Sequence, residues 1–592
     1  MENFAIKKSV INNEVILEGI PASPGIITGP CFKYHEISLS PEPRIVTKSK
    51  LEFEIKRFRR GVKKTLQFLR KTIPDTSGSY SEQLTEILSL QQAFLEDEIF
   101  LKEIEDKIKN EHYDALYAIY AVFQKKKEHF LQQTNEYFRE RAFDIQSLKR
   151  MLIKNILGKK IEIRLRKPSI VIADILSPSD TVKLHQQSVL GFATSTGGKN
   201  SHTAIVARAL GVPAVVGLER ITDLVQHGRV IALDGSHGRV IINPRKETII
   251  KYQNQQKIHL HLEKELLRES STVTTTKEGK RILIQANIEF EKELTNVKNV
   301  EADGIGLFRT EGIFINRETL PTEDEQFEVY SKIACEIYPQ KCVIRTLDIG
   351  GDKIMPNLIN VHEQNPYLGW RAIRFCLDHR DCFVSQIKAI LRANLKGNIQ
   401  ILLPLISSLE EVFQVRELMK EARQILVNEG RSFGDGIQLG IMVELPSVVF
   451  LADVFAREVD FFSIGTNDLV QYDLAVDRGN EKVAYLYSHF HPSVIRMIKH
   501  TLDAGNSARI PVSMCGEMAG DPLAIPLLLA MGFECISASP AIIPEIKKII
   551  REVDMGECQK LYNKVTELKT TKEVTALLQG FFKEKFRELE VL

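Results

Sequence analysis

The chain has 592 residues, several times the usual domain size, and its apolar fraction of 43% is that of an ordinary globular protein. Its 79 basic and 77 acidic side chains leave a formal charge of +2, which excludes bulk electrostatic attraction to nucleic acid or to an anionic membrane surface. No signal-peptide-like segment opens the chain and no uninterrupted apolar run reaches about 18 residues, so we expect a cytoplasmic protein without membrane insertion.

The first part of the chain changes from strand-like to helical patterns and back. Residues 15–20 have the pattern of a strand and precede the turn-forming Pro21-Ala22-Ser23-Pro24-Gly25. Four amphipathic helices then fit the apolar repeats at 51–69, 84–95, 116–123 and 145–156. Short apolar runs return at 169–173, 189–193, 213–217 and 230–234. The order predicts a helical bundle inserted into an α/β domain.

A glycine-rich turn opens directly into an apolar helix at His202. Gly197 and Gly198 can adopt positive φ, Asn200 and Ser201 are helix-capping residues, and a helix N-terminus offers free N–H donors to an anion. An imidazole at this place can act as a nucleophile toward phosphorus. The same pattern also fits an ordinary polar histidine beside a helix cap, so the motif alone does not decide the function.

The second half of the chain has the rhythm of a (β/α)₈ barrel. A polar, helix-compatible stretch runs to about residue 268, and the following Ser/Thr segment 270–276 has no packing pattern, which predicts a helical linker and a flexible joint. Eight strand candidates separated by helical stretches come next. They are 282–287, 304–309, 342–347, 399–405, 438–443, 461–466, 511–515 and 535–537.

Polar residues gather where these strands end, and in a barrel the strand ends share one rim, where active sites are built. They are Arg309, Arg345, Asp348, Glu444, Asn467, Asp468 and Cys515. Guanidiniums suit phosphate, carboxylates suit Mg²⁺, and a thiol of ordinary pKa about 8.5 can protonate a basic carbon. Each residue alone also fits an ion pair, a helix cap or a buried thiol. Together they predict a site that binds a small phosphorylated acid through a metal ion.

Seven segments in order resemble Enzyme I of the bacterial phosphoenolpyruvate:sugar phosphotransferase system, and the resemblance spans nearly the whole chain. They are 197–205 (GGKNSHTAI), 304–311 (GIGLFRTE), 345–353 (RTLDIGGDK), 369–374 (GWRAIR), 441–444 (IMVE), 461–480 (FFSIGTNDL through DRGN) and 514–521 (MCGEMAGD). The resemblance implies that His202 accepts the phosphoryl group of phosphoenolpyruvate on Nε2 and passes it to a histidine of the carrier protein HPr, with release of pyruvate.

The resemblance also implies roles for the rim and for the parts of the chain. Arg309 and Arg345 would hold the substrate phosphate, Asn467 and Arg478 would contact phosphate and carboxylate, Glu444 and Asp468 would bind Mg²⁺, and Cys515 would protonate the enolate carbon. Residues 1–39 and 151–245 would form the swivelling α/β phosphohistidine domain and 40–150 the HPr-docking insert. Residues 246–276 would form the linker and 277–592 the TIM barrel, through which the family implies a homodimer.

The sequence departs from the family pattern at positions next to the motifs. They are Gln91, Lys199, Asn200, Gly312, Leu445 and Val470; at Gly312 a large apolar residue is usual. Two other functions stay open. Pyruvate,phosphate dikinases and phosphoenolpyruvate synthases share these domains but need an ATP-binding domain, whereas only about 200 residues precede His202 and they hold no phosphate-cradling glycine loop. A non-catalytic regulatory relative is the other alternative, although the reactive residues are all present.

Overall fold

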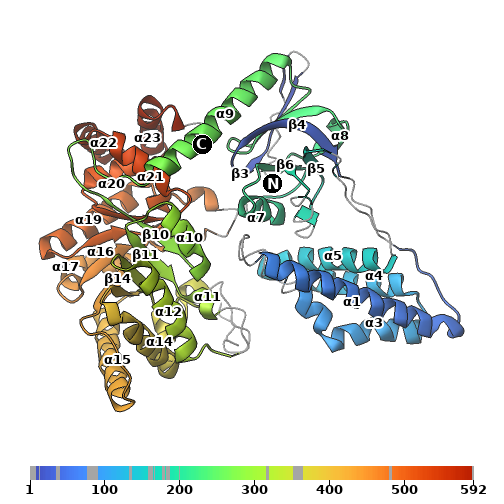
Figure 1. The fold of residues 1–592 in the computed structure, drawn as a ribbon, viewed down its shortest axis with the longest axis horizontal. Helices are drawn as coiled ribbons and strands as arrows, with labels where there is room; N and C mark the ends of the chain where they lie inside the picture. The colour runs from blue at the N-terminus through green and yellow to red at the C-terminus, as the bar shows by residue number, and fades with distance from the viewer. Residues whose placement is uncertain are drawn as a thin grey trace. The chain divides into compact units, whose positions relative to one another are not determined.

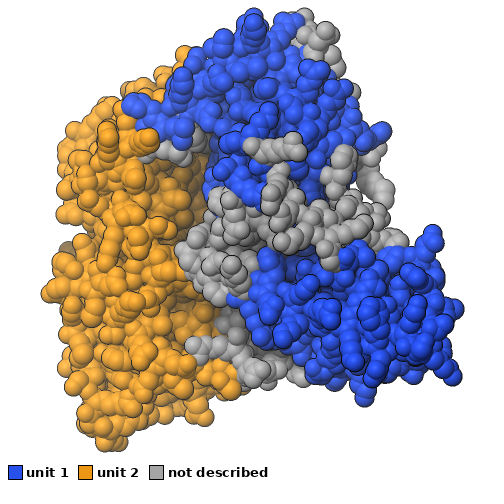
Figure 2. All heavy atoms as spheres, turned by 45° about the vertical axis from the view of Figure 1, so that its right-hand side comes forward, with its two compact units in different colours: residues 1–261, 591–592 blue, residues 262–590 orange. Residues whose placement is uncertain are grey.

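The computed structural model divides the chain into two compact units, residues 1–261 with 591–592 and residues 262–590 (Figure 2). The structure describes residues 9–11, 14–34, 41–76, 88, 91–131, 136–157, 165, 167–176, 180–181, 184, 187–198, 201–314, 319–350, 365–478, 480 and 483–589. No helix among these residues combines the length and apolarity needed to cross a membrane.

The α/β part of unit 1 is built on one mixed sheet. Within the described residues nine strands follow the order β1-β2-β9-β8-β4-β5-β6-β7-β3, and β4 to β7 pair in parallel (Figure 1). The bounds are β1 Ser9–Ile11, β2 Glu14–Glu18, β3 Ile20–Ser23, β4 Ile26–Lys33, β5 Ser169–Ala173, β6 Val189–Thr194, β7 Ala214–Val216, β8 Val230–Asp234 and β9 Arg239–Ile242. Helices α7 (His202–Ala209) and α8 (Ile221–Leu224) belong to the same part.

Strand β5 shows why apolar runs mark this sheet. Ile170 and Ile172 pack into one core and Val171 and Ala173 into another, so the strand is buried on both faces. The strands predicted at 169–173 and 230–234 are confirmed with the same bounds. The sequence does not predict β4, because Gly29 and Pro30 interrupt its apolar pattern.

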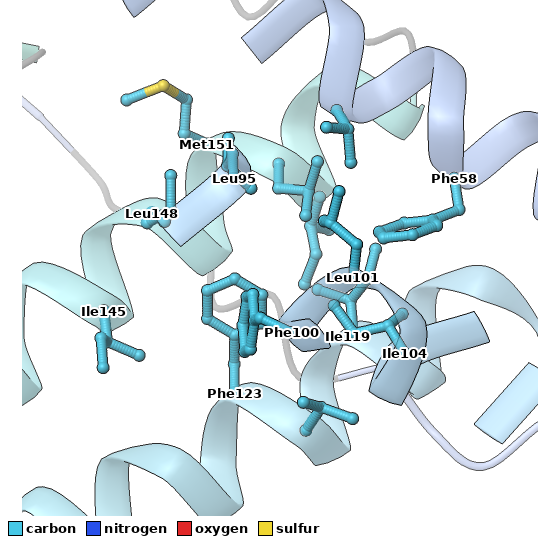
Figure 3. Close-up of a cluster of buried hydrophobic side chains, with 14 of the residues drawn as sticks. Phe58, Leu95, Phe100, Leu101, Ile104, Ile119, Phe123, Ile145, Leu148 and Met151 are labelled. Atoms are coloured by element: carbon cyan, nitrogen blue, oxygen red, sulfur yellow. The ribbon is translucent and has the colours of Figure 1, made fainter. Parts of the chain in front are cut away.

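The helical part of unit 1 contains α1 (Leu51–Thr76), α3 (Glu98–Glu111), α4 (Ala115–Leu131) and α5 (Glu136–Leu157). Phe58, Phe100, Ile104, Phe123 and Leu148 are among the buried side chains of its core (Figure 3). The predicted helices at 51–69, 116–123 and 145–156 are confirmed. Part of the one at 84–95 lies outside the described residues, although residues 91–96 are helical.

Helix α3 is missing from the sequence prediction. Its many charged residues conceal the core positions Phe100, Leu101, Ile104 and Ile108, which recur at helical spacing. The Asp97 side chain caps its first turn by accepting hydrogen bonds from the N–H groups of Ile99 and Phe100. The capping aspartate was therefore the available signal for this helix.

Helix α9 (Lys246–Glu269) begins in unit 1 and ends in unit 2, as expected for a helical linker. In unit 1 the Glu14 carboxylate accepts hydrogen bonds from the N–H of Arg245 and the hydroxyl of Thr248. In unit 2 the Lys547 ammonium donates to the carbonyl of Ser270 at 2.7 Å, just beyond the helix. Each end of the helix is therefore bonded to its own unit.

The segment 270–276 is packed only in part, because Ser271, Thr272 and Val273 are exposed, as its lack of a packing pattern predicts. Ser270, Thr274 and Thr276 are each at most 3% exposed. The N–H of Thr276 donates to the carbonyl of Lys280, and that of Ile282 donates to the carbonyl of Thr274. Serine and threonine carry no apolar periodicity, so the sequence pattern does not show that their main chain pairs with the following residues. The segment is therefore anchored to unit 2 at Ser270, Thr274 and Thr276.

Unit 2 contains a closed barrel of eight parallel strands in chain order among its described residues. The strands are β10 Leu283–Ile288, β11 Gly304–Arg309, β12 Lys341–Arg345, β13 Ile399–Leu403, β14 Gln438–Val443, β15 Phe461–Ile464, β16 Val512–Met514 and β17 Cys535–Ala538. All eight predicted strands are confirmed, with small shifts at their ends, and so is the multidomain α/β fold with a C-terminal TIM barrel.

Helices surround this barrel (Figure 1). They are α10 Leu294–Asn299, α11 Glu311–Phe314, α12 Glu323–Ile337, α13 Ile373–Asp378, α14 Arg380–Ala393, α15 Leu409–Asn428, α16 Pro446–Phe450, α17 Ala452–Phe455, α18 Thr466–Leu474, α19 Pro492–Ala508, α20 Ile525–Met531, α21 Ile543–Glu552, α22 Met555–Glu567 and α23 Thr571–Lys585. Five successive strands, β11 to β15, each contribute one side chain to a buried cluster that also contains Cys515. The five side chains are Leu307, Val343, Leu402, Met442 and Phe461. The parallel pairing brings the carboxyl ends of all strands to one rim.

Candidate active site at the carboxyl end of the barrel

The structure brings the polar strand-end residues to this rim. Arg309 and Arg345 are the last residues of β11 and β12. Glu444 directly follows β14, Cys515 directly follows β16, and Asp468 lies in the first turn of α18, which follows β15. Because the strands are parallel and adjacent, these side chains start from the same end of the barrel.

Arg345 is a buried guanidinium held by two carboxylates. Its Nη2 donates to Oε1 of Glu311 at 2.6 Å, and its Nη1 lies 3.1 Å from Oδ2 of Asp348. Burial alone lowers the pKa of Arg345, but Glu311 and Asp348 outweigh burial, so the pKa is raised. The side chain therefore carries a permanent positive charge in a fixed orientation, as recognition of a phosphate requires.

A second buried guanidinium, Arg371, was not singled out by the sequence. Its Nη2 donates to both oxygens of Asp348, at 3.0 and 3.2 Å, and to Oδ2 of Asp468 at 3.1 Å. Its Nη1 donates to the Tyr472 hydroxyl at 3.4 Å. Arg371 does not end a strand, so the strand-end criterion missed it, although it lies inside the segment 369–374 noted above. Its position between two carboxylates links β12 to α18.

Glu444 and Asp468 form a buried acidic pair that the arginines do not fully neutralise. Burial and the neighbouring charges of Asp468 and Asp348 raise the pKa of Glu444 to about 8. The Glu444 carboxylate accepts a hydrogen bond from the N–H of Leu405. Such a surplus of negative charge on hard oxygen ligands fits a divalent cation.

The described residues contain no group of three or more His, Cys, Asp or Glu side chains arranged to hold a metal. A cation at Glu444 and Asp468 would therefore need further oxygen ligands from substrate or water. In addition, Nε of Arg345 and Nε of Arg371 are buried donors without an acceptor among the described residues. Buried donors without acceptors are costly, so both suit an oxygen-rich ligand at this rim.

Cys515 lies at the inner edge of the same rim and is only 3% exposed. Burial raises its pKa to about 11, so the thiol keeps its proton at neutral pH. Its carbonyl accepts a hydrogen bond from the Asn287 amide at 3.0 Å, and its own N–H donates to the carbonyl of Ile464. The two bonds hold the main chain of the thiol residue between β10 and β15.

The remaining predicted residues are less enclosed. The Asn467 amide donates to Glu517 Oε1 at 3.1 Å, and its oxygen accepts the N–H of Glu517 at 2.7 Å. Arg309 is half-buried, and its guanidinium has no polar partner among the residues described in unit 2. Arg478 is exposed, and its main-chain N–H donates to the Gln471 side chain at 3.4 Å. These groups are positioned at the margin of the arginine and carboxylate network.

The second candidate site is the turn before α7 in unit 1, where His202 is the first helical residue. Gly197 has φ +119°, and a Cβ at this position would lie 2.9 Å from the Ser201 hydroxyl, so the turn requires glycine there. Asp174 holds the turn, because its carboxylate accepts hydrogen bonds from Ser195 and Thr222 at 2.8 and 2.6 Å. The sequence prediction did not include Asp174, whose place directly after β5 was the available signal.

Two of the departures at this turn, Lys199 and Asn200, lie outside the described residues. Ser201 is the N-cap of α7, with φ −65° and ψ 152°. The main chain thus turns into a helix at His202, but the Ser201 side chain forms no capping hydrogen bond, so the predicted side-chain cap is not found at this residue. His202 belongs to unit 1 and the barrel rim to unit 2.

Comparison with known proteins finds similarity along most of the chain. Three family models match this chain: PEP-utilising enzyme, N-terminal, at residues 18–141; PEP-utilising enzyme, mobile domain, at 165–238; and PEP-utilising enzyme, PEP-binding domain, at 263–555. The mobile-domain match includes His202, and the PEP-binding match includes the barrel rim.

Curated relatives match nearly the full length. The phosphoenolpyruvate-protein phosphotransferase of Staphylococcus carnosus is 39% identical over 573 residues, which cover 96% of this chain and 99% of the relative. The proteins of the same name from Geobacillus stearothermophilus and Bacillus subtilis are 38% and 36% identical, over 96% of this chain and 98% and 100% of theirs.

Proposed function

Because the chain belongs to the family of phosphoenolpyruvate-protein phosphotransferases, we propose that it transfers the phosphoryl group of phosphoenolpyruvate to its own His202. The phosphoryl group then passes to a histidine of the carrier protein HPr, and pyruvate is released. The observation that carries this proposal concerns the guanidiniums of Arg345 and Arg371. Their buried Nε donors have no acceptor among the described residues, and they lie near the acidic pair of Glu444 and Asp468.

The rim is suited to the substrate by charge. Arg345 is oriented by Glu311 and Asp348, and Arg309 has its guanidinium available at the adjacent strand end, so the two would bind the phosphate. Asn467 and Arg478, at the margin, would contact the phosphate and the carboxylate. Three guanidiniums and an amide donor match the charge and oxygen content of phosphoenolpyruvate.

Glu444 and Asp468 would hold Mg²⁺, together with substrate oxygens and water. The excess of buried negative charge that raises the pKa of Glu444 supports this assignment. When bound, the ion neutralises charge on the phosphate and carboxylate oxygens. Arg371 keeps Asp468 in place for this role by its hydrogen bond of 3.1 Å.

The chemistry is an in-line phosphoryl transfer followed by a proton transfer. The neutral imidazole of His202 attacks phosphorus through Nε2, and the bond between phosphorus and the enol oxygen breaks, so the electron pair stays on the enolate. Cys515 donates its proton to the methylene carbon, which forms pyruvate, and water reprotonates the thiolate. A thiol with a pKa of about 11 keeps its proton until the strongly basic enolate carbon appears.

Two partners follow from this proposal. The helical insert at 40–150 would dock HPr, and a homodimer would form through the barrel part at 277–592. The exposed apolar side chains of Phe450, Leu451 and Val454 on consecutive turns, at 72%, 49% and 37% exposure, support an interface on that surface. We expect light scattering to give twice the mass of one chain for the wild type and the mass of a single chain for Phe450→Glu.

His202 must meet both phosphoenolpyruvate and HPr, so we propose a swivel of the phosphohistidine domain (1–39 and 151–245) about the linker 246–276. Since Ser270 is buried and its carbonyl accepts a hydrogen bond from Lys547 of unit 2, the movement is assigned to the part of the linker before Ser270. A crosslink between the two units that left both half-reactions fast would contradict this movement.

The enzyme activity is tested with Mg²⁺ and ³²P-phosphoenolpyruvate. We expect an acid-labile, alkali-stable phosphoprotein in the wild type and none in His202→Ala. Addition of purified HPr should move the label to HPr. An unlabelled wild type would overturn the proposal, and a requirement for ATP would favour a dikinase instead.

A further inference from the structure

The rim contains an aromatic side chain, Phe290, that the reaction described above does not use. Phe290 follows strand β10 by two residues and is half-buried. Its N–H and that of Glu289 both donate to Oε2 of Glu293 at 2.8 Å, which holds the main chain of this loop. The Lys292 ammonium lies 5.3 Å from the ring centroid, a cation–π distance.

The ring of Phe290 lies against Gly312. A Cβ built on Gly312 would lie 2.4 Å from Cε1 and 2.7 Å from Cζ of Phe290, so the ring occupies the space where a side chain at position 312 would begin. Gly312 has no positive φ, so its main chain does not itself require glycine. What excludes a side chain at this position is the ring of Phe290.

The turn that carries Gly312 also carries the phosphate-binding groups. Arg309 ends β11, and Glu311 begins the four-residue helix α11. Oε1 of Glu311 accepts hydrogen bonds from Arg345 Nη2 at 2.6 Å and from the N–H of Asp348 at 3.1 Å. Glu311 and Phe314 of this short helix are fully buried, whereas Gly312 between them has no side chain with which to make a contact of its own.

We propose that Phe290 is a positioning residue for the phosphate clamp, acting through Gly312 and Glu311 on Arg345. The ring supplies the apolar contact that the residue at 312 lacks, and so it fixes the turn from Arg309 to Gly312. This inference rests on the proposed function, since it names a determinant of phosphoenolpyruvate binding. Displacement of a guanidinium by even about 1 Å is costly for a bidentate contact.

The geometry makes the two positions exchangeable, which gives a test by rescue. Phe290→Ala removes the ring and leaves a space next to Gly312. Gly312→Phe alone forces two rings into one volume. The double variant Phe290→Ala/Gly312→Phe puts one ring back into the same space from the other side of the contact. Residues that share a contact couple in this way, whereas independent ones add.

The variants are compared in steady-state pyruvate release with HPr present, with the KM for phosphoenolpyruvate and kcat measured separately. Phe290→Ala should raise KM about tenfold with a smaller change in kcat, because binding of the phosphate is affected first. Gly312→Phe should raise KM further than Phe290→Ala does. The double variant should have a KM within about threefold of that of the wild type. Melting temperatures are measured for all three.

Phe327→Ala is the matched control, because Phe327 is also half-buried but lies on α12 under the Arg392 guanidinium, 4.2 Å from its ring centroid. It should lower the melting temperature without changing KM. A wild-type KM in Phe290→Ala would overturn the inference. The inference would also be overturned if the KM of the double variant were as high as that of the poorer single variant, or if Phe290→Ala and Phe327→Ala changed KM equally. A wild type that forms no phosphohistidine would instead overturn the proposed function.

Discussion

Replacement of Arg371 by methionine tests the charge balance of the barrel rim most directly. Methionine replaces the aliphatic part of the arginine side chain, but Asp348 and Asp468 lose the guanidinium that lies 3.0 to 3.2 Å from their oxygens. Removing one partner of a buried ion pair costs about 3–5 kcal/mol. Here two carboxylates share that cost, so the part that falls on Asp468 is about 2 kcal/mol.

This cost should appear as a shift in the pH dependence of metal binding. Burial and two neighbouring carboxylates raise the pKa of Glu444 to about 8 in the metal-free protein, and Arg371 opposes this rise. Without Arg371 the proton is bound more tightly and competes with the metal up to a higher pH. We expect the pH midpoint of metal binding to move up by about one unit, and the affinity above that midpoint to rise, because a divalent cation gains more than a proton from the loss of a neighbouring positive charge.

Calorimetric titration with Mg²⁺ and with Mn²⁺ between pH 6.5 and 9.5 measures both quantities. Arg374→Met is the matched control, because Arg374 lies three residues later and, among the described residues, donates to the carbonyls of Leu368 and Gly369, both at 3.0 Å. Its metal affinity and pH profile should stay those of the wild type. Equal profiles for the two variants would refute the view that Arg371 neutralises the metal-binding carboxylates.

Three further changes have defined outcomes. Burial and the Asp521 charge raise the pKa of Glu545 to about 7, so the folded state favours the neutral carboxyl and stability falls as the pH rises from about 4.5 to 7. Glu545→Gln should therefore add about 2 kcal/mol to the free energy of unfolding at pH 8, measured by urea denaturation. An unchanged free energy of unfolding would contradict this. Cys515, 3% exposed with a pKa of about 11, should react with iodoacetamide at pH 8 at least tenfold more slowly than the exposed Cys335 in peptide mass spectrometry. Lys547→Met, which removes a buried donor to three carbonyls, should lower the unfolding free energy of unit 2 by about 3 kcal/mol, and an unchanged urea midpoint would argue against that role.

The predictability of the fold differs between its elements for physical reasons. The barrel strands are short apolar runs between turns, so all eight could be predicted from the pattern alone. Helix α3 could not, because charges surround its buried Phe100 and Ile104. In the segment 270–276, Thr274 and Thr276 are held by main-chain hydrogen bonds, which side-chain patterns do not reveal.

The candidate site shows the same division. Arg309, Arg345, Glu444 and Cys515 could be placed on one rim from the sequence, because each ends a predicted strand. Arg371 could not, since it lies in a loop whose position depends on the folded barrel. Phe290 follows a strand but has an apolar side chain, and the strand-end criterion considered only polar ones.

By itself the sequence determined the number and order of the barrel strands and the start of a helix at His202. Periodicity and turn residues are local properties, and parallel strands necessarily present their carboxyl ends on one face. Only the tertiary structure decided which charges meet: Arg345 with Glu311, and Arg371 with both Asp348 and Asp468. Ion pairing and pKa depend on distance and burial, which arise only when residues far apart in the chain pack together.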